Sequence, residues 1–432
     1  MKSGYIKAGK KMSKTTEKLN RFFAMIIILS LFLVFTQKIV LYNRSVFNSI
    51  SEGIMHRERT GESFVIKTYD FYIGVHKAVK EGIEWLFYTP PMSTYFDRAH
   101  YIYIRATNRN HFNGVTFLTD GRLMLDDKDY NAYLYERADA IVKLQGYTYE
   151  RGIPFLYVRI PSKLQDNSLL PRAFSENSII ANGDALLRTL KDNDVKTFDL
   201  REEMEKDGVD FATAFFRGDH HWTAETALWA YSKIGVYING EYGLGLDERT
   251  WDPQQYERVA FEGTFLRTEV EAVSAIGIPE DINALIPRFP AEFNVTSNWS
   301  ESYRYEVASG SFAEVFTPEL LKGQSSAFNY MEGLNAVHDG FNRYDNILVN
   351  NGKKVLIIAD SMGISIATYF ATAFESVDFL YLRNGQNERA WSAIDRYDYD
   401  LVIFAVSDVV ISQGNEPTFE NDRLYLGEPP GR

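Results

Sequence analysis

Cysteine is absent from the 432 residues of this chain. Its absence excludes disulfide bridges, thiolate metal sites and a cysteine nucleophile, so packing alone must stabilise the fold. An excess of positive charge is also absent outside the N-terminus, because residues 1–42 hold eight of the 46 lysines and arginines but only one of the 58 acidic residues, which leaves 38 basic against 57 acidic residues in the rest of the chain. The rest of the chain is strongly acidic, which argues against binding to a phosphate backbone, and we expect no nucleic-acid partner.

A long apolar run is present only near the N-terminus. Residues 22–35 carry no charge, and the run continues to Tyr42 with Lys38 as its one charged residue. A membrane-spanning helix needs about 20 mostly apolar residues, and residues 22–42 supply that length. The basic residues before it predict a cytoplasmic N-terminus, with everything after the span outside the cell membrane. A cleaved signal peptide is the alternative, but no small-x-small cleavage site follows the run.

Composition and hydrophobic pattern divide the chain outside the predicted span into four segments. We expect residues 1–21 to be a cytoplasmic basic tail, 43–113 a stalk, 114–415 a folded domain and 416–432 a C-terminal tail. Hydrophobic residues make up 45% and charged residues 24% of the chain, which is typical of a folded globular protein. The region 240–350, rich in Phe, Tyr, Pro and Asn, is predicted to be an irregular insertion or cap.

Helical and extended patterns alternate within the predicted domain. Helical periodicity covers residues 129–152 and 181–191. Short apolar, β-branched runs of the kind that form buried parallel strands lie at 153–160, 195–200, 354–359, 377–382 and 401–406. Strands spaced by helices predict an α/β fold with a parallel sheet and right-handed crossovers.

A first group of reactive residues lies in the sequence Gly-Asp-His-His-Trp-Thr at 218–223. In an extended segment Asp219 and His221 share one face, and His220 points away. A carboxylate beside an imidazole is the arrangement that orients a general base. Thr223 is a good N-cap for a helix over 224–238, so the pair is expected on a loop that leads into that helix.

Two other interpretations of this group are open. The first is a solvated Asp-His turn in which Trp222 simply fills the core. The second is a metal site, but the two histidines are expected to diverge and no further ligand spacing is evident. We therefore predict neither a metal nor a cofactor.

A second group follows the apolar strand 354–359, where the chain reads Asp360-Ser361-Met362-Gly363 and then continues as a helix. A serine at such a turn lies beside free backbone N–H groups and the positive end of the helix dipole. These features stabilise an oxyanion formed when the serine attacks an ester carbonyl, and Met362 N–H is the predicted donor. The alternative is a simple Asp-Ser helix cap.

The two groups together supply the three parts of a catalytic triad, with Ser361 as nucleophile, His221 as base and Asp219 as its orienting carboxylate. Further residues are predicted to line the site because they adjoin a triad residue in the sequence or lie close to the end of a strand: His220, Trp222, Asp360, Asn384 and Ser407.

These motifs resemble a known group of proteins. Asp360-Ser361-Met362-Gly363 is similar to the nucleophile block of SGNH/GDSL hydrolases. Residues 218–223 resemble the Asp-x-His-Trp block of the alginate O-acetylation proteins, and more closely that of the bacterial family named after its Asp-His-His-Trp (DHHW) motif. Weaker similarities lie at 159–171 and 198–201. The resemblance covers about residues 115–410.

The resemblance implies an SGNH-hydrolase-like three-layer α/β/α fold and the same triad roles for Ser361, His221 and Asp219. It also implies an outer-face O-acyl transferase, with acetyl as the expected group, that works beside a multi-pass membrane acyltransferase on a cell-surface polysaccharide. An esterase that removes acyl groups from such a glycan uses the same triad, so it is an alternative. A non-catalytic envelope assembly or binding protein is the third possibility.

Overall fold

The computed structural model describes residues 111–112, 115–125, 134–171, 178–265, 280–300, 303–317, 341–382, 389–412 and 426. Contacts divide the chain between Tyr103 and Ile104, and every described residue belongs to the second unit. The predicted cytoplasmic tail, the membrane span and most of the predicted stalk lie outside the described residues, as does Asn384. Of the predicted C-terminal tail, only Leu426 is described. Within the described ranges, no helix combines the length and the apolar character that membrane crossing requires.

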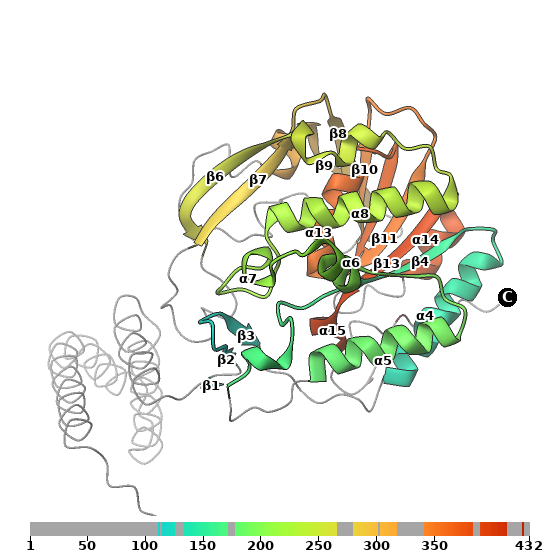
Figure 1. The fold of residues 1–432 in the computed structure, drawn as a ribbon. Helices are drawn as coiled ribbons and strands as arrows, with labels where there is room; N and C mark the ends of the chain where they lie inside the picture. The colour runs from blue at the N-terminus through green and yellow to red at the C-terminus, as the bar shows by residue number, and fades with distance from the viewer. Residues whose placement is uncertain are drawn as a thin grey trace, which may run out of the picture. The chain divides into compact units, whose positions relative to one another are not determined.

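A mixed eight-stranded sheet forms the centre of the described chain (Figure 1). Its strands, in spatial order, are β5 (Thr197–Asp199), β4 (Phe155–Ile160), β13 (Leu401–Ser407), β11 (Lys354–Ala359), β12 (Ser376–Tyr381), β10 (Phe341–Asn346), β8 (Glu292–Ser300) and β9 (Tyr303–Ser311). The five strands from β5 to β12 are parallel, as the apolar runs predict. Their carboxyl ends therefore share one edge of the sheet.

The other three strands correct two predictions. Strands β10, β8 and β9 pair antiparallel to one another, and β10 pairs antiparallel to β12, so the sheet is mixed rather than parallel. All three lie within residues 240–350, which therefore contribute regular structure to the main sheet instead of an irregular insertion. Their sequences mix polar and apolar residues, as is usual for antiparallel strands that are not covered by helices on both faces.

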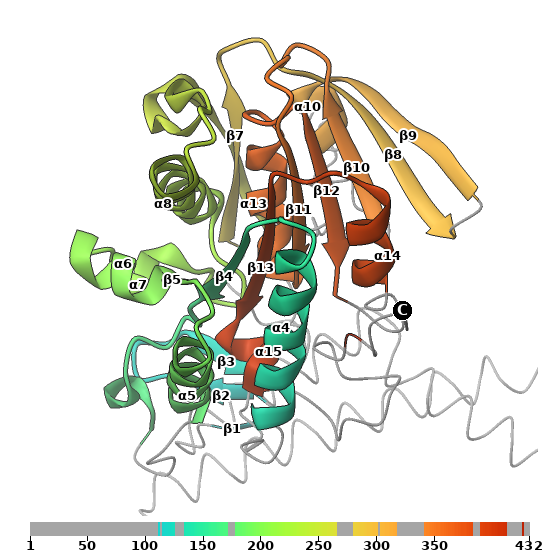
Figure 2. The same cartoon turned by 90° about the vertical axis from the view of Figure 1, so that its right-hand side faces the viewer.

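Helices cover both faces of the parallel part of the sheet. On one face α6 (Leu200–Asp207), α8 (Ala224–Tyr242), α13 (Ser361–Phe370) and α10 (Phe312–Phe316) pack against alternate strand residues such as Ile357 and Ile403. On the other face α4 (Leu134–Tyr149), α5 (Ser178–Asp192), α14 (Arg389–Arg396) and α15 (Asp408–Ser412) pack against the residues between them, such as Ile358 and Phe404. Figure 2 shows α8 and α13 on one side of the strands and α4 and α14 on the other.

Smaller elements lie outside the main sheet. Strands β1 (His111–Phe112), β2 (Val115–Phe117) and β3 (Leu123–Leu125) form one small sheet, and β6 (Tyr256–Phe265) pairs with β7 (Glu280–Pro287) in another. The short helix α7 (Phe211–Ala214) precedes α8, and 3-10 turns lie at Asn167–Leu169, Glu248–Trp251 and Pro253–Gln255. In Figure 1 the connection from α7 to α8 lies between the β6–β7 pair and the β1–β3 sheet.

Candidate active site

The loop Phe215–Trp222 carries the Asp-His motif between α7 and α8. Its two ends are joined by an antiparallel bridge between Phe215 and Trp222, and Phe216 N–H donates to the His221 carbonyl at 3.1 Å. Thr223 caps α8 as predicted, with its side chain accepting from the backbone N–H of Thr226. The loop is thus closed at its base, and Asp219 and His221 lie in its second half, which leads back to α8.

Asp219, His221 and Ser361 form a continuous hydrogen-bonded chain. The Nδ1 of His221 lies 2.5 Å from Asp219 Oδ1, and its Nε2 lies 2.9 Å from Ser361 Oγ. Asp219 Oδ1 also accepts the backbone N–H of His221 at 2.8 Å, which fixes the imidazole to its own main chain. All three residues are more than 90% buried. The structure therefore brings together the three residues that the two sequence motifs predict.

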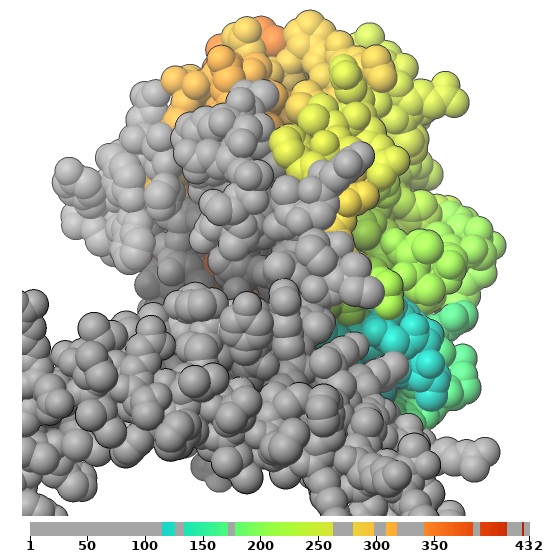
Figure 3. Space-filling view, turned by 90° about the vertical axis from the view of Figure 1, so that its left-hand side faces the viewer, coloured from blue at the N-terminus to red at the C-terminus, as the bar shows by residue number. Residues whose placement is uncertain are grey.

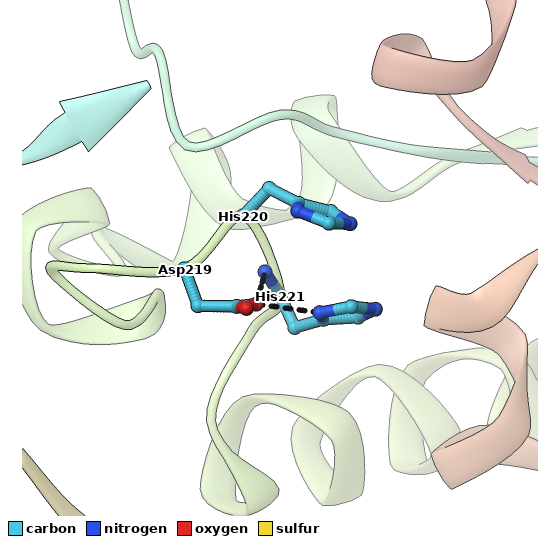
Figure 4. A group of neighbouring side chains, drawn as sticks. All are labelled: Asp219, His220 and His221. Atoms are coloured by element: carbon cyan, nitrogen blue, oxygen red, sulfur yellow. Dashed lines mark hydrogen bonds and ion pairs between the residues drawn. The ribbon is translucent and has the colours of Figure 1, made fainter. Parts of the chain in front are cut away.

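His220 does not point away from His221. The two imidazole rings lie one above the other, with centroids 4.1 Å apart and planes inclined by 34° (Figure 4). The expectation of opposite faces assumed an extended segment, whereas residues 217–221 form a bend. In a bend the two-residue alternation of a strand is lost, so neighbouring side chains can turn to the same side.

The side-by-side histidines and Asp219 also form a group with metal-ligand chemistry. One ligand atom from each of the three residues lies within 4.8 Å of the others. Asp219 Oδ1 and both ring nitrogens of His221 are, however, engaged in the chain that ends at Ser361. A metal bound here would replace that chain, so the arrangement fits an acid–base triad better than a resident ion.

The nucleophile turn is held by Asp360 at the end of β11. Its Oδ1 accepts Met362 N–H at 3.0 Å as the N-cap of α13. Its Oδ2 accepts both the backbone N–H and the hydroxyl of Ser407, at 2.8 and 2.6 Å. Asp360 and Ser407 are fully buried behind the serine, so they fix the ends of β11 and β13 relative to each other instead of lining the site.

The backbone N–H groups near Ser361 differ in what they bind. Met362 N–H, the predicted oxyanion donor, donates to Asp360, and Gly363 N–H donates to the Asp360 carbonyl at 3.0 Å. Within the part of the chain that the structure describes, Ser361 N–H makes no hydrogen bond. Ser361 N–H is therefore the donor available at the first turn of α13.

Trp222 lies in the core and joins the two halves of the site. Its side chain is fully buried, and its Nε1–H donates to Ser365 Oγ at 3.0 Å. Ser365 in turn donates to the Met362 carbonyl at 3.2 Å. Ser365 follows Ser361 by one helical turn and so lies on the same helix face. This spacing could have indicated from the sequence that Ser365 lies close to the site.

A buried ion group lies next to Ser407. The guanidinium of Arg159, at the end of β4, binds both carboxylate oxygens of Asp408, at 2.9 and 3.1 Å, and contacts Asp184 and Asp199. Burial raises the pKa of Asp408 to about 6, against the opposing effect of Arg159. Burial alone would lower the pKa of Arg159, but the three carboxylates outweigh it and raise that pKa. The group ties β4, β5, α5 and α15 together beside the site.

Part of the chain is similar in sequence to a known family. Residues 117–275 match the family model of the SGNH hydrolase-like domain of the acetyltransferase AlgX. The matched range contains Asp219 and His221 and ends before Ser361. No curated protein sequence matches the chain.

Solved structures share the fold at low sequence identity. The structure of Bacillus cereus PatB1 with a sulfonyl adduct covers 72% of this chain and 99% of its own length, with a TM-score of 0.56 and 17% identity. A DHHW family protein from Eubacterium siraeum covers 71% of this chain and 94% of its own, with a TM-score of 0.51 and 13% identity. The resemblance to the SGNH hydrolase-like domain of O-acetylation proteins is confirmed over residues 117–275. The likeness to the DHHW family protein is a likeness of fold, and the fold is an SGNH-like α/β fold with a mixed sheet.

Proposed function

We propose that this chain is an O-acyl transferase that moves an acyl group, acetyl in the first instance, onto a polysaccharide of the cell envelope through an acyl-serine intermediate. The single observation that carries the proposal is the buried chain from Asp219 through His221 to Ser361, with contacts of 2.5 and 2.9 Å. The match of residues 117–275 to an acetyltransferase domain supports the choice of acyl group.

The geometry assigns each proton in the reaction. Ionised Asp219 accepts a hydrogen bond from His221 Nδ1–H, so Nε2 is left to accept the hydroxyl proton of Ser361. Ser361 Oγ then attacks the carbonyl carbon of the donor ester, and the alcohol leaves with the proton from Nε2. A sugar hydroxyl attacks the acyl-serine next, gives its proton to Nε2, and Ser361 regains that proton as its bond to the acyl group breaks.

The negative charge on the carbonyl oxygen needs donors in both steps. Ser361 N–H is the donor we assign, because it has no partner among the described residues and lies at the first turn of α13. Met362 N–H could contribute only after it leaves Asp360. The dipole of α13 adds to the positive potential at the same place.

The proposed reaction takes place at the outer side of the cell membrane. The basic tail and apolar run at residues 22–42 support a single-pass anchor that holds the domain on the outer side of the cell membrane. Such an anchor would place Ser361 next to a multi-pass membrane acyltransferase that delivers acyl groups across the bilayer. Water in place of the sugar hydroxyl would make the same triad an esterase.

The test is hydrolysis of a chromogenic acetyl ester by the purified full-length chain, with Ser361→Ala and Ser392→Ala compared. Ser392 lies on α14, on the opposite face of the sheet, and serves as the matched control. We expect Ser361→Ala to lower kcat/KM at least about a thousand-fold and Ser392→Ala to leave it unchanged. Equal turnover by Ser361→Ala, or none by folded wild-type protein, would count against the triad.

A second measurement separates the transferase from the esterase. Acetate release and acetylated glycan are measured together, with and without an acceptor polysaccharide. A transferase lowers acetate release when the acceptor is added and forms acetylated glycan in its place. Release that stays constant, with no acetylated product, favours the esterase. Normal envelope acetylation in a Ser361→Ala strain favours a non-catalytic assembly role.

A further inference from the structure

The position of Asp219 and His221 depends on the arm of the loop that precedes them. Phe216 and Arg217 begin this arm, and Gly218 leads directly into Asp219. The two ends of the loop are joined to each other at its base through the Phe215–Trp222 bridge. A loop that is fixed only at its base can still move at its tip. Contacts along the arm therefore decide how well His221 stays aligned with Ser361.

One side of the arm faces the ammonium group of Lys163. The side chain of Lys163 is about 99% buried, and Nζ donates to the carbonyl of Phe216 at 3.0 Å and, more weakly, to that of Arg217 at 3.4 Å. The third contact is the carbonyl of Leu123 on β3. Because an ammonium has three donors, these carbonyls satisfy it, and hydrogen bonds from a buried charge are stronger than those between neutral groups.

The other side of the arm faces the carboxylate of Glu280 at the start of β7. Its two oxygens accept the backbone N–H groups of Arg217 and Gly218, each at 2.7 Å. The β6–β7 pair also covers the Phe216 side chain with Ile282 and Ala284. Figure 3 shows this side of the molecule, with yellow residues of the β6–β7 region above the green ones and the cyan β2–β3 residues below.

The two charges act on the same peptide units. The carbonyl of Phe216 and the N–H of Arg217 belong to one peptide bond, and the carbonyl of Arg217 and the N–H of Gly218 belong to the next. In a trans peptide these groups point in opposite directions. Lys163 therefore holds the carbonyl side of the first peptide and, together with Leu123 N–H, which donates to the Arg217 carbonyl at 2.8 Å, that of the second. Glu280 holds the N–H side of both, and each bond polarises the peptide in the sense that strengthens the other.

We infer that Lys163 and Glu280 are positioning residues that hold the Asp219–His221 loop in register with Ser361, an inference that rests on the proposed function of the triad. They come from different parts of the fold, one after β4 and the other from the β6–β7 pair. Neither contacts the reacting atoms. Their role is to keep the imidazole at the distance that proton transfer requires.

Glu280 is the better residue to change, because it lies near the surface whereas loss of the buried Lys163 can prevent folding. Glu280→Ala removes both hydrogen bonds, and Glu280→Gln retains one carbonyl acceptor. Glu257 lies on the partner strand β6 and is exposed, and its side chain makes no hydrogen bond within the described residues, so Glu257→Gln is the matched control. The full-length chain is used throughout, with the melting temperature of each variant recorded.

Misalignment of a catalytic group by about 1 Å can cost about a hundred-fold in rate. We expect kcat to fall about 10- to 100-fold in Glu280→Ala, less in Glu280→Gln and not at all in Glu257→Gln, with KM for the acetyl ester within about three-fold of wild type. Labelling of Ser361 by a sulfonyl fluoride should slow in the same order. Wild-type kcat in Glu280→Ala would overturn the inference.

Hydrogen exchange provides a readout that needs no catalysis. Peptides from residues 211–222 should exchange faster in Glu280→Ala than in wild type, while peptides from α4 exchange equally in both. Unchanged exchange in the loop would overturn the inference whatever the activity. Failure of wild-type protein to turn over ester would count against the triad instead. Lys163→Met, where it folds, should accelerate exchange in the same peptides.

Discussion

The 2.9 Å contact between His221 and Ser361 joins two side chains that are 140 residues apart in the sequence. Trp222 directly follows His221, and Ser365 lies one helical turn after Ser361, so their hydrogen bond is a second link between the same two elements. The indole is fully buried, so its N–H must find an acceptor inside the core. Ser365 is that acceptor, and the pair keeps the loop and α13 together.

Removal of either partner of this link should lower both stability and activity. Ser365→Ala leaves the indole N–H buried without its acceptor, and Trp222→Phe removes the donor and opens a small cavity. We expect each to cost about 1–3 kcal/mol of unfolding free energy and to lower kcat for the acetyl ester. Chemical denaturation of the two single variants and the double variant measures the coupling.

The double variant should lose less than the sum of the single ones, by about 0.5–2 kcal/mol, because the second change removes a partner that the first has already stranded. Trp229→Phe is the matched control, since its Nε1–H binds the surface residue Asp207. That variant should stay within about 0.5 kcal/mol of wild type. Simple additivity at positions 222 and 365 would contradict a direct link.

Among the elements, α13 packs closely against β11 next to the site. The helix begins at Ser361, directly after β11, and an added Cβ at Gly363 would lie 2.2 Å from the Cβ of Ala359. Real side chains do not approach so closely, so glycine at this position allows the first turn of α13 to rest on the strand. The height of Ser361 above the sheet is set by that contact.

Gly363→Ala should therefore displace the first turn of α13 and move Ser361 away from His221. We expect a loss of about 1–3 kcal/mol in stability, from overpacking, together with a fall in kcat. Gly146→Ala in α4 is the control, because an added Cβ there meets no atom within 4 Å. It should stabilise the protein by about 0.5–1 kcal/mol through helix propensity. Wild-type activity in Gly363→Ala would show that α13 has room to adjust.

Some of the elements could be predicted from the sequence and others could not. The apolar runs predicted β4, β11, β12 and β13, because a strand buried on both faces needs an uninterrupted apolar segment. The antiparallel strands β8, β9 and β10 were missed, since their mixed composition resembles a loop until pairing partners are known. The triad residues followed from local motifs. Glu280, whose role comes from contacts across 62 and 63 residues, carries no local signal at all.

At the scale of the whole molecule, charge separates along the chain. The first 42 residues are basic, whereas the rest is acidic enough to bring the formal net charge to −12. Lysine and arginine beside an apolar span are retained on the cytoplasmic side, and an acidic domain is compatible with export. In the proposed anchored form, the orientation of the chain would decide on which side of the membrane the candidate triad of the described domain meets an acyl acceptor.

The absence of cysteine makes this orientation measurable, because any introduced thiol is the only one in the chain. Ser3→Cys should resist a membrane-impermeant maleimide in intact spheroplasts, since the basic tail is predicted to be cytoplasmic. Asp192→Cys, at an exposed position at the end of α5, should react at once. Both should react after lysis. Reaction of Ser3→Cys in intact spheroplasts, or protection of Asp192→Cys, would contradict the predicted orientation. A Ser3→Cys protein that lacks its N-terminus after export would indicate a cleaved signal peptide.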